Sequence, residues 1–526
     1  MDIPAEANDK RDINPWVIAA TVLLATFMEV LDTTIVNVSL PHIAGNLSAS
    51  IEESTWVVTS YLVSNAVVLP LTGWFSTLFG RKRFYMVCVF LFTVSSIMCG
   101  LAPSLGLLIF FRILQGAGGG ALQPISQAVL VESFPRNKTG MAMAMFGMGV
   151  VLAPIIGPTL GGWITDNYTW RWIFLINIPV GIASLLLTSI FIFDPPFLVR
   201  KSLKQGLKID YIGLGLICLG LGSLQVTLDK GQQEDWFGSN FIIVTVVLAA
   251  IGLIGAVVWE LLQKEPMVDL RLLKNRNFGL ATLTIFMVGF TLYGSTVLFP
   301  IYLQTLMGYT ALLSGLVLSP GGLMVVLMMP IVGRLIQKFE ARWLVVFGVT
   351  VVSLSLFHMA HFNLDIDFRT AMMARVWQSM GLAFLFVPIS TAAFYYIPKA
   401  KINNATGIMN LARNIGGSFG IAQVTTMLAR RAQFHQNILI THLTPLDGRY
   451  QAALTGTAQT LILRGSDPVR AANQAQGLLY GMVQRHATML AFSDSFWLMG
   501  MIFIAMVPLI FLMKKAEPGK APAGVH

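Results

Sequence analysis

Two carboxylic acids, Glu29 and Asp32, stand within the first long apolar stretch of the sequence, residues 16–36. Their three-residue spacing places both side chains on one face of a helix. Ionisable groups inside a bilayer are costly and mark functional sites by default. Burial favours the protonated carboxyl group, whereas water or a nearby arginine favours the carboxylate, so such a group can load and release a proton. We therefore interpret Asp32 and Glu29 as proton-coupling residues; simple solvation near the outer surface is the alternative.

A basic counterpart, Arg112, lies in a later apolar stretch, residues 105–131. Its guanidinium could pair with Asp32, which would favour the ionised carboxylate, or hold a water molecule near it. A structural anchor that donates to backbone carbonyls is the alternative. Arg375 and Arg413 are the equivalents in the second half of the chain, where no acidic residue matches Asp32. We expect those two arginines to be structural or to face a substrate.

The elements that must position these residues are apolar helices. Of the 526 residues, 55% are hydrophobic and only 11% are charged, and the mean hydropathy is +0.71. This composition excludes a water-soluble globular protein and a disordered chain, and the unbroken apolar runs exclude a transmembrane β-barrel. We predict an all-α polytopic membrane protein, in which about 20 apolar residues make one span. Fourteen spans are predicted, near residues 16–36, 55–76, 84–102, 105–131, 140–164, 172–193, 211–228, 241–261, 279–303, 311–333, 343–360, 370–397, 404–429 and 496–513.

The basic residues of the chain indicate its orientation in the membrane. The formal net charge is +10, and Lys and Arg concentrate in alternate short loops, such as residues 81–83 and 200–208. Cytoplasmic loops of membrane proteins carry this excess. We therefore predict that both termini are cytoplasmic and that nucleic acid is not a partner. Because Cys88, Cys99 and Cys218 all fall within predicted spans, neither a disulfide framework nor a zinc site is expected.

Related markers recur in the two halves of the chain. Arg112 and Gln115 are repeated 263 positions later as Arg375 and Gln378. Repeated halves are typical of transporters that bind their substrate near the midplane between two bundles; chance similarity among apolar helices is the alternative. The predicted division is a six-helix bundle at 1–193, a linker with two additional spans at 194–278, and a second six-helix bundle at 279–526.

One predicted outer loop, residues 431–494, is exceptionally long. It contains helix-like stretches at 450–464 and 468–486. Loops of this length are uncommon unless they are functional. We interpret the loop as a docking surface for an external partner; an ordinary surface cap is the alternative.

Glycine and proline interrupt the fifth predicted span. Small residues let helices approach closely, and proline bends them. A close-packed, bent helix can serve as a gate, so the structural and functional interpretations coincide here. The residues concerned are Gly157, Pro158, Gly161 and Gly162.

Amide and methionine side chains of the central spans are the candidates for substrate binding. Methionine offers adaptable apolar surface that suits varied hydrophobic ligands, although ordinary helix packing explains most methionines equally well. The candidates are Gln115, Gln123, Met143, Met148, Gln378 and Asn410. An enzyme is not predicted, because the glycines at 116–120 lack the Gly-Lys-Ser/Thr of a phosphate loop and no HExxH motif occurs.

Several segments resemble motifs of the major facilitator superfamily, specifically of its 14-span drug:proton antiporters. Residues 31–41 are similar to the first-helix motif of that branch, 112–116 to the fourth-helix motif and 157–162 to the antiporter motif. A loop motif for gating is carried by Gly73, Gly80, Arg81 and Lys82. Thr77 departs from this motif, because the family usually has Asp there, and this puts the usual charge relay of the loop in doubt.

The resemblance continues through residues 170–179 and 223–237 and is closer to the EmrB-type multidrug efflux permeases of Gram-negative bacteria. It implies a multi-pass protein of the bacterial inner membrane with the major facilitator fold. Protons would be the coupling ion without any cofactor, and Arg112 would take part in proton transfer. The implied partners are a periplasmic adaptor (membrane fusion) protein and, through it, an outer-membrane channel.

We expect a proton-driven exporter of hydrophobic toxic compounds, such as drugs, uncouplers, antibiotics or fatty acids, that conveys antibiotic resistance. One alternative is a narrow-specificity metabolite or siderophore exporter with the same coupling. A second is a non-transporting membrane sensor built on a transporter fold, which would have lost its coupling residues. Asp32, Arg112 and the 157–162 motif are all present, which favours transport.

Overall fold

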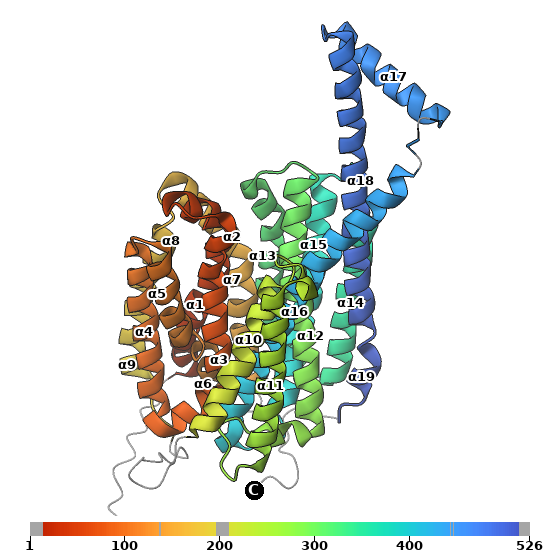
Figure 1. Cartoon of the computed structure of the whole chain (residues 1–526). Helices are drawn as coiled ribbons and strands as arrows, with labels where there is room; N and C mark the ends of the chain where they lie inside the picture. The colour runs from red at the N-terminus through yellow and green to blue at the C-terminus, as the bar shows by residue number, and fades with distance from the viewer. Residues whose placement is uncertain (1–13, 136–137, 196–209, 442, 445, 515–526) are drawn as a thin grey trace, which may run out of the picture.

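The structure is a computed structural model that describes residues 14–135, 138–195, 210–441, 443–444 and 446–514. Those residues form helices joined by short connections, with no strand among them. Figure 1 shows two groups of helices standing side by side, the N-terminal group in red to orange and the C-terminal group in green to blue. The predicted all-α polytopic architecture is therefore confirmed.

The N-terminal group contains six predicted spans, two of which are broken. The fourth is divided at Gly120 and Ala121, and the sixth is divided at Ile176. Its helices are α1 (Pro15–Asn46), α2 (Ile51–Ser54), α3 (Trp56–Phe79), α4 (Arg81–Leu101), α5 (Leu105–Gly119), α6 (Leu122–Ser133), α7 (Thr139–Asn167), α8 (Trp172–Leu175) and α9 (Asn177–Phe191).

Two further long helices, α10 (Tyr211–Lys230) and α11 (Asn240–Leu262), lie in the middle of the chain. They pack closely on each other where the backbones of Gly220 and Gly252 meet. Because α10 also contacts helices of both groups, this pair lies beside the place where the groups adjoin. The basic loop at 200–208 falls outside the described residues.

The C-terminal group begins after a short 3₁₀ turn and contains the remaining helices. They are α12 (Arg276–Thr305), α13 (Ala311–Leu335), α14 (Ala341–Ala360), α15 (Phe368–Phe394), α16 (Ile402–Ile440), α17 (Gly448–Leu463), α18 (Pro468–Ile504) and α19 (Val507–Phe511).

Thirteen helices among the described residues are long and apolar enough to cross a membrane. Each corresponds to one of the fourteen predicted spans. The remaining predicted span, 404–429, lies within α16, which is 39 residues long but more polar than the others. This helix packs against α3 and α6 of the N-terminal group as well as against α12 and α18.

The predicted 431–494 loop is largely helical. The two helix-like stretches are α17 and the first part of α18, and α18 continues without a break to Ile504. Figure 1 shows α17 and the first half of α18, in blue, standing out beyond the rest of the protein. At their base Asp494 of α18 accepts hydrogen bonds from Arg431 and contacts His435, both on α16, at 2.5 and 2.7 Å. This projection is therefore anchored to the C-terminal group by polar contacts.

The glycines of the fifth predicted span bring α7 against α1. A Cβ atom at Gly157 would lie within 2.1 Å of Thr34, and one at Gly161 would lie 2.8 Å from the backbone oxygen of Ile35. A side chain at Gly157 would displace the Thr34 side chain, and one at Gly161 has no room unless a helix moves. Gly162 faces a wider gap, in which a Cβ would lie 3.7 Å from Val38. Close packing thus positions α1, which carries both predicted proton-coupling residues.

Candidate functional site

The predicted partnership of Asp32 and Arg112 is present in the structure. Arg112 Nη1 on α5 donates to Asp32 Oδ2 on α1 at 2.5 Å, and neither side chain is exposed to solvent. A buried ion pair is stable only when further hydrogen bonds satisfy its remaining atoms. Here Arg112 Nε also donates to the backbone oxygen of Val57 at 3.0 Å, and the guanidinium lies over the Tyr61 ring at 4.2 Å from its centre.

Two amides complete the surroundings of the Asp32 carboxylate. Gln115 Nε2 on α5 and Asn177 Nδ2 on α9 each donate to Oδ1 at 3.0 Å. Arg112 is also held by Gln115, whose Oε1 accepts a hydrogen bond from Nη1 at 2.8 Å. Both oxygens of Asp32 are therefore occupied by donors. A proton on Oδ2 would compete with Arg112 for the same oxygen, so protonation and the ion pair exclude each other.

Asn177 is a contact of Asp32 that the sequence did not single out. It lies in the segment 170–179, whose resemblance to a family motif does not indicate a contact with Asp32. The feature of the sequence that could have identified Asn177 is its amide side chain at the start of an apolar helix. Asn177 Nδ2 also donates to Ser96 on α4 at 3.0 Å, so it joins the carboxylate to the opposite side of the N-terminal group.

Glu29 is also buried, one helical turn away, but it lies in a separate cluster. Its Oε1 accepts hydrogen bonds from Tyr61 at 3.3 Å and from Asn65 at 3.1 Å, both on α3. Its Oε2 accepts a hydrogen bond from Gln123 Nε2 on α6. Glu29 is thus bonded by three neutral donors and by no arginine, in contrast to Asp32.

The Glu29 cluster extends across to the C-terminal group. Arg413 on α16 donates to Gln123 Oε1, and its positive charge attracts the Glu29 carboxylate. A second link joins Asn414 Nδ2 to Asn65 Oδ1 at 3.3 Å. Glu29 therefore lies at the junction of the two groups of helices, whereas Asp32 lies inside the N-terminal group.

The predicted substrate-binding residues are all buried or half-buried and take part in several separate contacts. Gln115 donates a hydrogen bond to Asp32, and Gln123 donates one to Glu29. Asn410 Nδ2 donates to Gln127 Oε1 at 2.8 Å, and Gln127 in turn approaches the Met143 sulfur at 3.9 Å. Gln378 lies in the C-terminal group beside Arg375, and Met148 is a half-buried packing residue.

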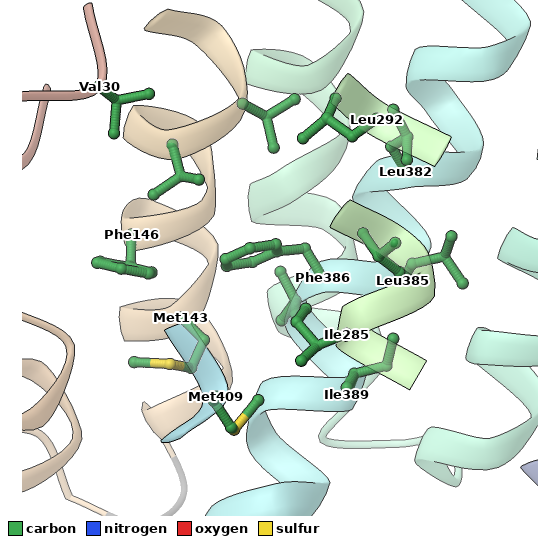
Figure 2. Packing of buried hydrophobic residues seen from close by; sticks show 14 of the residues in the cluster. Val30, Met143, Phe146, Ile285, Leu292, Leu382, Leu385, Phe386, Ile389 and Met409 are labelled. Carbon is green, nitrogen blue, oxygen red and sulfur yellow. The ribbon is translucent and has the colours of Figure 1, made fainter. Parts of the chain in front are cut away.

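A layer of aromatic and thioether side chains separates the two groups near these amides. Phe146 on α7 and Phe386 on α15 face each other with ring centres 5.9 Å apart, and Figure 2 shows the two rings at the same height, with Met143 below Phe146. Phe386 also lies under the Arg413 guanidinium, 5.8 Å from it. The sequence did not predict these two phenylalanines, because nothing in an apolar stretch distinguishes a residue facing the other bundle from one facing lipid.

The predicted loop motif contains an ion pair that does not involve Thr77, the residue that differs from the family pattern. Arg81 pairs with Glu132 at the end of α6, and the Lys82 backbone amide donates to Asp194 at 2.8 Å. Thr77 instead donates to the backbone oxygen of Trp74 within its own helix at 2.7 Å. Arg81 therefore pairs with the carboxylate of Glu132. Thr77 has no carboxylate that could take this role.

Glycines of that motif have local structural roles. Gly80 has a φ of 81°, which favours glycine, at the sharp turn between α3 and α4. A Cβ at Gly73 would overlap the Asn404 side chain of α16, so this glycine permits a close contact between the two groups. Within the described residues, no cluster of three or more His, Cys, Asp or Glu is arranged to hold a metal ion.

Comparison with known proteins identifies the family. The profile of the Major Facilitator Superfamily matches residues 22–421. The chain belongs to this superfamily. It is 36% identical to the multidrug export protein EmrB of Escherichia coli K12 over 96% of both chains. It is 38% identical to EmrB of Haemophilus influenzae, with 93% of this chain and 94% of that one covered. The fatty acid resistance protein FarB of Neisseria gonorrhoeae is 37% identical over 96% of both chains.

Solved structures support the same fold. The proton:xylose symporter XylE superposes with a TM-score of 0.60, covering 96% of this chain and 97% of that one, at 12% sequence identity. The human organic anion transporter MFSD10 gives a TM-score of 0.57. At such low identity these likenesses establish the major facilitator fold alone. Together with the superfamily match, they make this protein a membrane transporter related to multidrug exporters.

Proposed function

We propose that this superfamily member is a proton-driven antiporter that exports hydrophobic toxic compounds across the bacterial inner membrane. The observation that supports this most strongly is the buried contact between Asp32 and Arg112, in which an arginine and a proton compete for one carboxylate oxygen. A carrier needs such a competition, because it allows a single carboxylate to hold its proton in one conformation and release it in another.

In the proposed cycle, Asp32 takes up a proton from the outer side, and Arg112 leaves Oδ2. Return of Arg112 to the carboxylate expels the proton toward the cytoplasm, and binding of substrate favours that return. Glu29 lies where the two groups of helices meet, so its own protonation would change the attraction to Arg413 across that junction. A proton moving through about 150 mV supplies roughly 3.5 kcal/mol, which suffices for a roughly 300-fold gradient of a neutral solute.

The chemistry of the junction supports hydrophobic substrates. Phe146, Phe386 and Met143 present polarisable surface there, with the amides of Gln123 and Asn410 close by. Sites that bind varied ligands combine such apolar, adaptable surface with a few polar groups. Relatives named for multidrug export and for fatty acid resistance accord with this substrate class.

The proposed coupling is tested with proteoliposomes that contain the full-length protein and an acidic interior. We expect a neutral hydrophobic toxin to accumulate inside by about tenfold per unit of pH difference if one proton leaves for each solute. Liposomes without protein and liposomes treated with a protonophore provide the controls. Accumulation that is the same without a pH gradient would contradict proton-driven export.

We further propose that the projection formed by α17 and the first half of α18 binds a periplasmic adaptor protein. Apolar residues are exposed on it: Leu446, just before α17, is 96% exposed, and Leu463 and Val469, at the turn between α17 and α18, are 89% and 72% exposed. Apolar side chains so far from the membrane-spanning helices indicate a binding surface for protein. The adaptor would in turn connect the transporter to an outer-membrane channel.

The docking proposal predicts that Leu463→Asp with Val469→Asp lowers resistance of cells to hydrophobic toxins by about tenfold, since interface anchors contribute 2 kcal/mol or more. Transport in proteoliposomes should stay within about twofold of wild type, because the substitutions lie outside the spans. Gln476→Ala, on an exposed part of α18, is the matched control. Equal loss in cells and proteoliposomes, or no loss in cells, would count against adaptor docking.

A further inference from the structure

The C-terminal group contains a near copy of the Asp32 site in which the carboxylate is replaced. Asp32, Arg112 and Gln115 correspond to Ser295, Arg375 and Gln378, each 263 positions later. The contacts correspond as well. Arg375 Nη1 donates to Ser295 Oγ at 3.2 Å and to Gln378 Oε1 at 2.6 Å, as Arg112 Nη1 does to Asp32 and Gln115. A hydroxyl group therefore occupies the place of the acid.

This replacement leaves a buried positive charge without a counter-ion. Arg375 is fully buried, and among the described residues no carboxylate lies within 4.0 Å of its guanidinium. Its other hydrogen bond goes to Thr296 Oγ1 at 3.1 Å, a neutral group. By comparison, Arg112 has Asp32, and Arg413 has the attraction of Glu29. Leaving a buried charge unpaired is expensive, so an anion that reached Arg375 would be strongly attracted.

One donor without an acceptor marks the position that an anion would take. Gln115 Nε2 donates to Asp32, whereas the corresponding Gln378 Nε2 has no hydrogen-bond partner in the structure. Arg375 Nε and the hydroxyl oxygen of Ser379 also lack partners, but they do not mark the anion position, because the corresponding Arg112 Nε donates to Val57 and not to Asp32. All three side chains are fully buried. Buried polar groups are nearly always satisfied, so the unpartnered Gln378 Nε2 beside an unpaired arginine requires an explanation.

The geometry points to a monovalent anion site formed by Arg375, Gln378 and Ser295. Its ligand would lie next to the Ser295 hydroxyl and accept from Gln378 Nε2, as the Asp32 carboxylate accepts from Gln115 in the other half. Two ligands share this chemistry: a small inorganic anion such as chloride, and the carboxylate group of an exported hydrophobic acid. The anion site stands independently of the transport activity, whereas its assignment to an exported acid rests on the proposed export function.

The site is tested by thermal unfolding of the purified full-length protein in detergent. Sodium chloride is compared with sodium gluconate at equal ionic strength, since the many hydroxyl groups of gluconate make its burial costly. Octanoate is compared with its neutral methyl ester in the gluconate buffer. At about ten times its dissociation constant, the bound anion should raise the unfolding midpoint by about 1–2 °C.

Two variants separate the site from general salt effects. Arg375→Gln removes the charge, and Ser295→Asp supplies the carboxylate from within, as Asp32 does for Arg112. Both should lose the anion-dependent shift, and Ser295→Asp should unfold at a higher temperature than wild type in gluconate. Arg369→Gln changes an exposed arginine at the start of α15 and should keep the full shift.

Each outcome has a definite meaning. A shift with chloride that both variants lose assigns an inorganic anion to the site. A shift with octanoate but not with its ester or chloride, again lost in both variants, assigns the carboxylate of a hydrophobic acid. No shift in the wild type, or a shift that Ser295→Asp retains in full, would overturn the anion site and leave Arg375 a structural hydrogen-bond donor. Because unfolding does not depend on transport, failure of antiport would leave this result unaffected.

Discussion

Replacing Arg112 with Leu is expected to abolish proton-coupled transport and to destabilise the protein. The change leaves the Asp32 carboxylate buried without its cation, and breaking a buried ion pair in this way costs about 3–5 kcal/mol. Asp32 would avoid that cost by remaining protonated, so it could no longer release its proton. We expect the initial rate of substrate-driven proton release to fall by about 100-fold or more, measured with a pH dye in proteoliposomes.

A double variant separates stability from coupling. Asp32→Asn with Arg112→Gln replaces two charges by neutral amides that can still hydrogen-bond to each other and to Gln115. Its thermal midpoint should recover most of the loss seen in Arg112→Leu, whereas its proton release should not recover. If Arg112→Leu transported protons normally, the competition between arginine and proton at Asp32 Oδ2 could not be the basis of coupling.

Gly161→Ala is expected to impair transport strongly, while the neighbouring Gly162→Ala is not. The new Cβ at position 161 would lie 2.8 Å from the backbone oxygen of Ile35, so α1 must move away from α7. Overpacking of this kind costs about 1–3 kcal/mol. The displaced part of α1 lies one turn from Asp32, so the contact with Arg112 would be disturbed as well.

The adjacent glycine is the matched control. At position 162 a Cβ would make an ordinary contact of 3.7 Å with Val38, and alanine is a better helix former than glycine by about 1 kcal/mol. Thermal unfolding and transport rate should both distinguish the two variants. Equal behaviour of Gly161→Ala and Gly162→Ala would show that the approach of α1 and α7 does not position the site.

The sequence predicted the helices far better than their interruptions. A long apolar stretch in a membrane can satisfy its backbone hydrogen bonds only as a helix, so the spans were predictable. The predicted span at 105–131 is instead two helices, because Pro124 has no N–H to donate to the carbonyl of Gly120 and so interrupts the helical hydrogen bonding there. The polarity of α16, which sets it below the other spans in hydropathy, reflects side chains that face the N-terminal group: Asn403, Asn410 and Arg413 are all buried there.

The sequence identified most of the residues of the candidate site but only some of the contacts between them. The rarity of acids in apolar segments identified Asp32 and Glu29, and the same reasoning found Arg112. That Asp32 pairs with Arg112 while Glu29 bonds to Gln123 depends on rotations of α1, α5 and α6 about their axes, which an apolar sequence does not specify. Asn177 escaped notice for a related reason: an isolated amide is common at helix starts, and only the fold brings it to Asp32.

The most direct test of the account uses acid-loaded proteoliposomes that contain the wild type or Asp32→Asn, with an internal pH dye. Addition of a hydrophobic toxin should cause proton release in the wild type and none above background in Asp32→Asn. The variant should still bind the toxin, because Asp32 lies inside the N-terminal group rather than at the junction. Proton release that survives in Asp32→Asn would remove this residue from the proton path and leave Glu29 as the coupling carboxylate.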